Sequence, residues 1–281
     1  MPILQAILMG FIQGLTEFLP ISSSGHLVLT SCLYKLFTGT ELVHNNSQEA
    51  FFDIILHVGT LVAILVYFRD DIVDIIKKFI TACKEKKFNS NEAKLPLFIA
   101  LSTIFTLIVV LPIKDIVEKM LVAPIFTGIF LLITSIVLYS SEWISKKFKQ
   151  KESHITIKRA ILIGLAQGFA IFPGLSRSGM TIATGLATGL DRVSCAKYSF
   201  LLSVPIIAAA SLLYPLIDID YKELASFDWA SIFIGFVVSA VIGYLCIKYF
   251  IKFLSKFSMN VFAYYCFFVG LAMIIGFKHF V

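Results

Sequence analysis

Long apolar stretches separated by short polar segments dominate this chain. Six of them reach the ~20 residues that a helix needs to cross the hydrocarbon core of a bilayer. They cover residues 50–69, 95–113, 122–141, 194–217, 229–250 and 259–278. The pattern predicts six transmembrane helices, and therefore an all-α, polytopic membrane protein.

Two further apolar stretches, 3–19 and 157–172, are too short to cross a bilayer. Each runs into a proline and a Ser/Gly-rich cluster, and a second short apolar run follows, at 27–37 and 180–190. A short helix, a polar break and another short helix are typical of a re-entrant hairpin. Such irregular backbone is stable at membrane depth only where it is buried in protein or lines a wet cavity.

The two predicted hairpins resemble each other in sequence. Residues 6–26 align with 160–180 at a constant offset of 154, with ten identities in 21 positions that include Gln, Gly and Ser. Three predicted spans follow each hairpin, and an odd number of spans inverts the second unit relative to the first. We therefore predict a single integral membrane domain over 1–281. It is an inverted-topology repeat, with one repeat at about 1–145 and the other at about 155–281.

The distribution of Lys and Arg orients the predicted spans. Fourteen of these residues lie in the connections 70–94, 142–159 and 251–258, against four in 38–49, 114–121, 218–228 and the C-terminal tail. Loops rich in Lys and Arg stay in the cytoplasm. Both chain termini are therefore expected outside, with the first hairpin entering from the outer face and the second from the inner face.

The composition agrees with a membrane protein. Hydrophobic residues make up 58% of the chain, charged residues 15%, and the mean hydropathy is +0.89. Soluble domains have ~45–50% apolar and ~25% charged residues, so an ordinary soluble domain is excluded. The net charge of +6 is carried between apolar blocks, which argues against a nucleic-acid partner. Five widely spaced cysteines without a CxxC motif support neither a zinc site nor a disulfide framework.

The first hairpin carries an acidic residue inside an apolar helix. Gln13 and Glu17 are four residues apart and share a helix face. A carboxylate at membrane depth must pair with a cation, bind a metal or stay protonated. Metal ligation, acid–base chemistry and a structural contact with the second hairpin all remain open for this pair.

A Ser/Gly-rich turn follows Pro20, where backbone N–H groups can converge on an anion at a helix N-terminus. The three-residue spacing of Ser23 and His26 suits a Ser nucleophile with a His base, or a His that protonates a leaving group. Helix capping by the serines is the structural alternative. The candidate residues of this turn are Ser22, Ser23, Ser24, Gly25 and His26.

The second hairpin contains an isolated cation, Arg177. Its planar guanidinium matches phosphate or carboxylate oxygens, and a salt bridge to Glu17 is the structural alternative. The candidate residues of this segment are Ser176, Arg177, Ser178, Gly179 and Thr181.

Three other polar features are interpreted as structural. We expect Gln167, which aligns with Gln13, to join two helices. Asp191 and Arg192 are expected to cap a helix at the membrane interface, and His57 to be a satisfied buried histidine.

Together the two hairpins offer the groups that bind a phosphate. Arg177 and backbone amides would stabilise its charge, and a divalent cation, Mg²⁺ or Ca²⁺, could bridge Glu17 and the phosphate oxygens, with Gln13 as a second ligand. A phosphate site inside a membrane implies an amphiphilic substrate. The sequence thus predicts a site for a lipid phosphate, in which Glu17, Ser23, His26 and Arg177 are the candidate catalytic residues.

At these residues the chain resembles the undecaprenyl-diphosphate phosphatase family, the bacitracin-resistance proteins. The strongest matches are QGLTEFLPISSSGH at 13–26 and FPGLSRSGMT at 172–181. The resemblance implies a membrane hydrolase that converts undecaprenyl diphosphate to undecaprenyl phosphate and inorganic phosphate, which recycles the lipid carrier for peptidoglycan synthesis. It also implies a divalent metal and an outward-facing site in a bacterial cytoplasmic membrane.

Carried over by position, Gln13 and Glu17 match the family's Glu/Gln-x-x-x-Glu element, and Ser23 and His26 match its proposed nucleophile and partner. Many members carry Glu where this chain has Gln13, so a two-carboxylate metal site is in doubt. The inverted repeat alone would also suit a transporter of a lipid carrier or another phosphate-containing substrate. The sequence leaves the oligomeric state open, a homodimer included.

Overall fold

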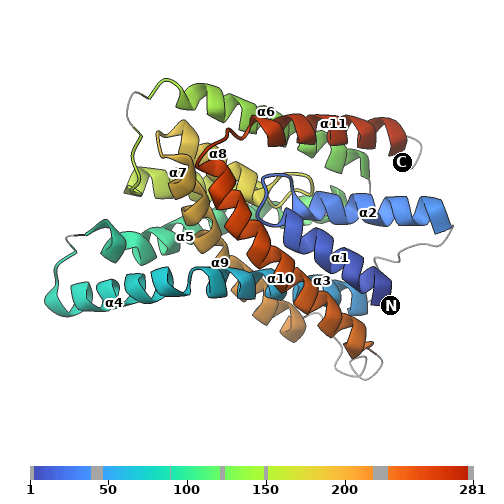
Figure 1. Ribbon diagram of the computed structural model, residues 1–281, viewed down its shortest axis with the longest axis horizontal. Helices are drawn as coiled ribbons and strands as arrows, with labels where there is room; N and C mark the ends of the chain where they lie inside the picture. The colour runs from blue at the N-terminus through green and yellow to red at the C-terminus, as the bar shows by residue number, and fades with distance from the viewer. Residues whose placement is uncertain are drawn as a thin grey trace.

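The computed structural model describes residues 3–38, 47–88, 90–120, 124–148, 151–217 and 227–277. Within these ranges the chain forms eleven helices, and the only β-pairing is an isolated bridge between Glu152 and Leu190 (Figure 1). The predicted outer connections 38–49 and 218–228 fall largely outside the described residues, whereas 114–120 continues the helix Asn91–Met120 and is not a connection. The helices are α1 (Ile3–Thr16), α2 (Ser23–Thr38), α3 (Ser47–Tyr67), α4 (Arg69–Glu85), α5 (Asn91–Met120), α6 (Pro124–Ser145), α7 (Ile157–Phe169), α8 (Arg177–Ala187), α9 (Arg192–Ile217), α10 (Trp229–Leu254) and α11 (Asn260–Phe277).

Six of these helices, α3, α5, α6, α9, α10 and α11, are long and apolar enough to cross a membrane. They coincide with the six predicted spans, so the prediction of an all-α protein with six such helices is confirmed. The two shorter apolar stretches each form a pair of short helices, α1 with α2 and α7 with α8. The chain is non-helical between the members of each pair, at 17–22 and 170–176, as the Pro, Ser and Gly clusters predict.

The Lys-rich segment 70–94, interpreted from sequence only as a connection, contains the helix α4. Asp70 and Asp71 lie in its first turn and Lys84 in its last, which matches the helix dipole at both ends. Ile75 and Ala82 are buried, whereas the basic side chains are mostly exposed. This division of faces suits a helix at a membrane interface.

The first helix of each hairpin packs against a long helix through small residues. Gly10 and Gly14 of α1 lie against the backbone of Gly235 and Ser239 in α10. Gly164 and Gly168 of α7 lie in the same way against Ser102 and Thr106 in α5. In both pairs the contacting residues are four positions apart on each helix, so they lie on one face. Small residues placed in this way let the backbones of membrane helices come into close contact.

Hydroxyl groups reinforce the α5–α7 contact. Ser102 donates to the carbonyl of Ala160, and Thr106 donates to that of Gly164, at 2.7 and 2.9 Å. The amide of Gln167 donates to the hydroxyl of Thr106 at 2.9 Å. The prediction that Gln167 joins two helices is therefore confirmed.

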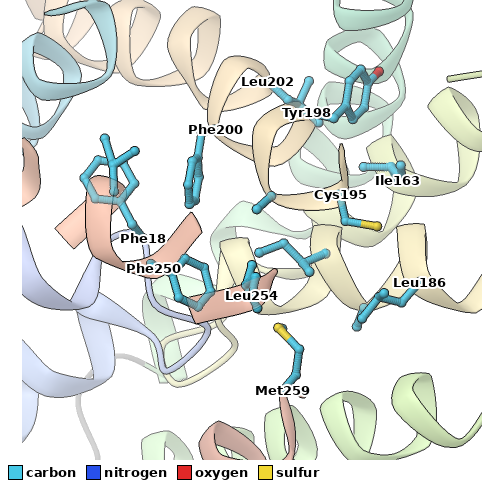
Figure 2. Packing of buried hydrophobic residues seen from close by; sticks show 14 of the residues in the cluster. Phe18, Ile163, Leu186, Cys195, Tyr198, Phe200, Leu202, Phe250, Leu254 and Met259 are labelled. Atoms are coloured by element: carbon cyan, nitrogen blue, oxygen red, sulfur yellow. The ribbon is translucent and has the colours of Figure 1, made fainter. Parts of the chain in front are cut away.

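The main cluster of buried apolar side chains includes residues of α7, α8, α9 and α10 (Figure 2). Phe18 belongs to this cluster and is completely buried. Its ring meets the edge of Phe200 in α9, with ring centroids 5.2 Å apart, and Phe200 in turn contacts Phe250 in α10. Because Phe18 follows Glu17 directly, this contact fixes the position of the first hairpin's turn.

A buried ion pair ties three of the long helices together. Glu142 of α6 accepts two hydrogen bonds from the guanidinium of Arg192 in α9, at 2.8 and 2.6 Å, and a third from the backbone N–H of Met259 before α11. Asp191 caps α9 by accepting the N–H of Ser194. The predicted cap is thus confirmed for Asp191, whereas Arg192 serves the contact between helices.

The glycine contacts predict different effects for two equally conservative substitutions. A Cβ at Gly164 would collide with the backbone of Ser102, whereas a Cβ at Gly276 in α11 meets no atom within 4 Å. We expect Gly164→Ala to lower the free energy of unfolding by about 2 kcal/mol or more. Gly276→Ala should be neutral or gain up to about 1 kcal/mol. Thermal unfolding in detergent measures both, and equal midpoints for the two variants would contradict the packing described.

Candidate active site

The turns of the two hairpins meet at the carboxylate of Glu17, which is only 6% exposed. Its Oε2 accepts hydrogen bonds from the hydroxyl of Ser23, at 2.7 Å, and from the amide nitrogen of Gln13, at 2.9 Å. Its Oε1 accepts one from Nη2 of Arg177, at 2.9 Å. The structure therefore brings Arg177 to three candidates of the first hairpin, and it contains the Glu17–Arg177 ion pair that the sequence offered as a structural alternative.

Ser23 and Arg177 hold equivalent positions in the two hairpins. They align at the offset of 154 residues, and each is the first residue of the second helix of its hairpin, α2 or α8. The preceding serines, Ser22 and Ser176, accept the N–H groups of Gly25 and Gly179 with their hydroxyls. Two capped helix N-termini thus converge near Glu17. Helix N-termini attract anions, because their first N–H groups point outward and the helix dipole is positive there.

The backbone adopts unusual conformations on both sides of the site. Ser22 has a φ of +70°, in the left-handed region that non-glycine residues rarely occupy, and Gly174 has a φ of +98°. A Cβ at Gly174 would also collide with the backbone of Thr127. Strained residues of this kind persist where the surrounding structure fixes them. The carbonyl of Ser22 accepts hydrogen bonds from both the backbone N–H and the ring Nδ1 of His26.

Arg177 is oriented by two acceptors at once. While Nη2 binds Glu17, Nη1 donates to the backbone carbonyl of Ser199 in α9, at 3.2 Å. The hydroxyl of Thr181 bonds to that of Ser199, and Ser178 donates to the carbonyl of Leu19 in the other hairpin. Thr181 and Ser178 are both 1% exposed. Ser178 thus joins the two hairpins and Thr181 joins the second hairpin to α9. Both hydroxyls are engaged in these structural hydrogen bonds.

The three-residue spacing suggested that His26 pairs with Ser23, but in the structure it does not. One ring nitrogen, Nδ1, lies 2.8 Å from the carbonyl of Ser22, so it must carry the hydrogen. The other, Nε2, lies 2.8 Å from the hydroxyl of Tyr265 in α11, which donates to it in the neutral imidazole. The hydroxyl of Ser23 donates instead to Glu17. The proton acceptor beside Ser23 is therefore a carboxylate and not an imidazole.

A cavity of about 350 Å³ opens beside these residues. One wall is polar and carries the helix N-termini with Glu17 and Arg177, whereas the other is largely apolar and comes from α3 and α9. His26, Gly25, Ser178, Gly179 and Thr181 do not line it. The predicted candidates that do line it are Glu17, Ser22, Ser23, Ser24, Ser176 and Arg177, and the opposite wall includes Ile54, His57, Ile206, Ile207, Ala210 and Ser211.

Sequence reasoning missed two polar groups in this cavity. His57, interpreted as a structural residue, directs its Nε2 toward Oε2 of Glu17 at 3.7 Å, and its side chain is 34% exposed. The hydroxyl of Ser211 is buried without a hydrogen-bond partner in the structure. Both residues lie on helices that are long and apolar enough to cross a membrane. An ionisable residue in such a helix is a functional candidate by default, and on that ground His57 could have been identified from the sequence.

The residues fit a cation that is shared with a bound phosphate. No group of three or more His, Cys, Asp and Glu side chains converges in the described part of the chain. Gln13 turns its amide nitrogen toward Glu17, so its Oε1 points elsewhere and is buried without a partner. Glu17 is therefore the one carboxylate ligand available here. Ions such as Mg²⁺ are commonly held by one or two carboxylates, substrate phosphates and water.

Comparison with known proteins gives consistent matches over nearly the whole chain. A family model described as bacitracin resistance protein BacA matches residues 6–272. A protein of Methanosphaera stadtmanae named undecaprenyl-diphosphatase is 42% identical, over 97% of both chains. Proteins with the same name from Halothermothrix orenii and Korarchaeum cryptofilum are 41% and 36% identical, over 98% of this chain and 98% and 99% of theirs.

The ion pair between the hairpins predicts a non-additive effect on stability. In Arg177→Met, the buried carboxylate of Glu17 loses its cation, which should cost about 3 kcal/mol of unfolding free energy. The double variant Glu17→Gln/Arg177→Met removes both charges and should recover most of that loss. Thermal unfolding of the purified single and double variants tests this coupling. Additive losses would show that the two charges do not interact.

Proposed function

The chain belongs to the bacitracin resistance protein BacA family, and on that premise we propose that it is an undecaprenyl-diphosphate phosphatase. It hydrolyses undecaprenyl diphosphate to undecaprenyl phosphate and inorganic phosphate within the membrane. The product is the lipid carrier for peptidoglycan synthesis, and its renewal underlies resistance to bacitracin. No relative named above is a transporter, and no feature of the site favours transport over hydrolysis.

One observation carries this proposal. Ser23 and Arg177, the first residues of two converging helices, both bind the carboxylate of Glu17 in the wall of one cavity. A binding site alone needs a cation and N–H donors for phosphate. The hydroxyl of Ser23 also donates to the carboxylate of Glu17 at 2.7 Å, so a proton acceptor lies beside a hydroxyl that can be deprotonated. Hydrolysis needs such a proton acceptor, whereas phosphate binding does not.

The two walls of the cavity match the two parts of the substrate. We assign the terminal phosphate to the N-termini of α2 and α8, where backbone amides and Arg177 stabilise its negative charge. The phosphate next to the lipid and the first isoprene unit then lie toward the apolar wall formed by Ile54, Ile206 and Ile207. The isoprenoid chain extends along this apolar wall toward the bilayer.

In this arrangement Glu17 acts as the proton acceptor for the attack on phosphorus. If Ser23 attacks, its Oγ–P bond forms as the bridging P–O bond to undecaprenyl phosphate breaks, and Glu17 takes the hydroxyl proton. Water then hydrolyses the phosphoserine, which releases inorganic phosphate and restores the hydroxyl. If Ser23 orients a water molecule, the same carboxylate takes the proton from that water in a single step.

A divalent cation, Mg²⁺ or Ca²⁺, is part of the proposal. Glu17 would hold it together with phosphate oxygens, and when bound it neutralises charge on the diphosphate. Gln13 supports Glu17 through its amide nitrogen. His26 keeps a supporting role, because its two ring nitrogens fix the turn of the first hairpin to Ser22 and Tyr265.

We also propose that the fold is an inverted-topology repeat. The matching glycine contacts of α1 with α10 and of α7 with α5 support it. So does the direct packing of α3 on α9 and of α6 on α11, because equivalent helices meet at a two-fold axis. The site at the meeting point of two broken helices is where such repeats place their substrates.

Phosphate release from farnesyl or undecaprenyl diphosphate by the purified chain tests the function. We expect release that EDTA abolishes. Ser23→Ala and Glu17→Ala should remove activity, and Arg177→Ala should lower kcat by about 10²–10³-fold, because a donor to the developing charge is lost. Cys83→Ser, exposed on α4 far from the cavity, serves as the control and should have full activity.

A folded wild type that binds the diphosphate lipid and releases no phosphate would contradict hydrolysis. That result would favour the transporter, with the same residues acting as a phosphate gate. Near-normal activity of Arg177→Ala would reject the assignment of this residue to the terminal phosphate.

We propose that the cavity opens to the outer face of the cytoplasmic membrane. In Figure 1, α4 and the end of α6, which flank Lys-rich connections, lie toward the left, whereas the start of α1 and the end of α11 lie at the right. Labelling with a membrane-impermeant maleimide tests this orientation. Cys83 should react only in inside-out vesicles, and Ser24→Cys in a Cys83→Ser background only in intact cells. The reverse pattern would place the site on the cytoplasmic face.

A further inference from the structure

His57 of α3 stands in the wall of the cavity with its ring orientation fixed. Its Nδ1 lies 2.8 Å from the backbone carbonyl of Asp53, which can only accept a hydrogen bond. Nδ1 therefore carries the hydrogen, and in the neutral imidazole Nε2 presents a lone pair. That lone pair faces Oε2 of Glu17 at 3.7 Å, so two electron-pair donors point toward one another in the cavity.

When both groups are unprotonated they repel each other, unless a proton on Nε2 or a metal ion lies between them. A metal ion bound by both atoms would remove the conflict. Ligand atoms about 2.1 Å from a shared ion are about 3.0–3.4 Å apart in octahedral and tetrahedral sites. The observed separation of 3.7 Å thus needs a small closing movement of the His57 or Glu17 side chain, and the ion would replace one of the two hydrogen bonds that Oε2 accepts from Ser23 and Gln13.

The other described histidines lack this arrangement. His26 has the same hydrogen on Nδ1, but its Nε2 bonds to the hydroxyl of Tyr265 and it does not line the cavity. His154 also directs its Nε2 toward a carboxylate, Oε2 of Glu152 at 3.3 Å, but this oxygen is bound by Arg159 and the pair does not line the cavity. Among the described residues, His57 is therefore the histidine whose second nitrogen faces the carboxylate of the site.

We propose that His57 is a direct ligand, through Nε2, of the divalent cation that Glu17 shares with the diphosphate. The inference rests on the proposed function only for the identity of that diphosphate. Phosphate oxygens and water complete the coordination. An imidazole nitrogen is a poorer ligand for Mg²⁺ and Ca²⁺, which prefer oxygen, than for first-row transition metals, and of these Mn²⁺ also suits the carboxylate and phosphate oxygens of this site. The site should therefore bind Mn²⁺ more tightly than Ca²⁺.

Pulsed EPR of the full chain in detergent, loaded with Mn²⁺ and inorganic diphosphate, tests the ligand directly. The ¹⁴N modulation of a coordinated imidazole should be present in the wild type and in His154→Gln, and absent in His57→Gln. Titration should show at least about a tenfold weaker Mn²⁺ affinity in His57→Gln, since even supporting residues of metal sites contribute that much. The Ca²⁺ affinity should change less. His57→Ala provides a second variant if the glutamine protein does not fold.

Three results would overturn the proposal: no Mn²⁺ bound to the wild type, bound Mn²⁺ without imidazole modulation, or modulation that survives in His57→Gln and disappears in His26→Gln. None of these depends on catalysis. A wild type with the predicted signal but no phosphate release would leave the cation site intact and reject the phosphatase instead.

Discussion

Glu17 carries a carboxylate into a part of the chain where little water can reach it, so protein groups must satisfy its oxygens. Three donors do so, from α1, α2 and α8, and the cation among them comes from the other half of the sequence. The two hairpins therefore cannot be placed independently. The contact of Phe18 with Phe200 and the bond from Ser178 to Leu19 hold their turns at the distance that this ion pair requires.

The repeat explains how such a site can be assembled. Two similar hairpins supply two similar helix N-termini, each preceded by a capping serine. The differences between them supply the chemistry. Glu17 stands where the second hairpin has Ile171, and Arg177 stands where the first has Ser23. A symmetric backbone thus presents an acid and a hydroxyl from one side and a cation from the other, around one cavity.

Much of this was predictable from sequence, because lipid imposes simple rules on length and polarity. The six long helices and the two broken ones follow from apolar length and from the Pro and Ser clusters. The cost of an unpaired charge in a membrane made the Glu17–Arg177 contact one of the alternatives. The pairing of Ser23 with Glu17 does not follow. A spacing of three residues suggested His26, but the His26 ring bonds to the carbonyl of Ser22 and the hydroxyl of Tyr265 instead.

The contribution of α3 and α9 was not predicted, although an ionisable residue in an apolar helix is by itself a reason to consider His57. His57 and Ser211 belong to helices that pack on each other, α3 also on α10 and α9 also on α8, and nothing local in the sequence shows which of their faces meets the hairpins. Helix α4 escaped notice because its apolar residues are interrupted by the lysines that identified the segment as a cytoplasmic connection.

An experimental structure with a prenyl methylene-diphosphonate, which cannot be hydrolysed, tests the central claim most directly. The claim predicts the terminal phosphonate at the N-termini of α2 and α8, in contact with Arg177, and with the hydroxyl of Ser23 between its phosphorus and Glu17. A diphosphonate bound elsewhere, with the Glu17–Arg177 pair closed and the cavity without ligand, would contradict it.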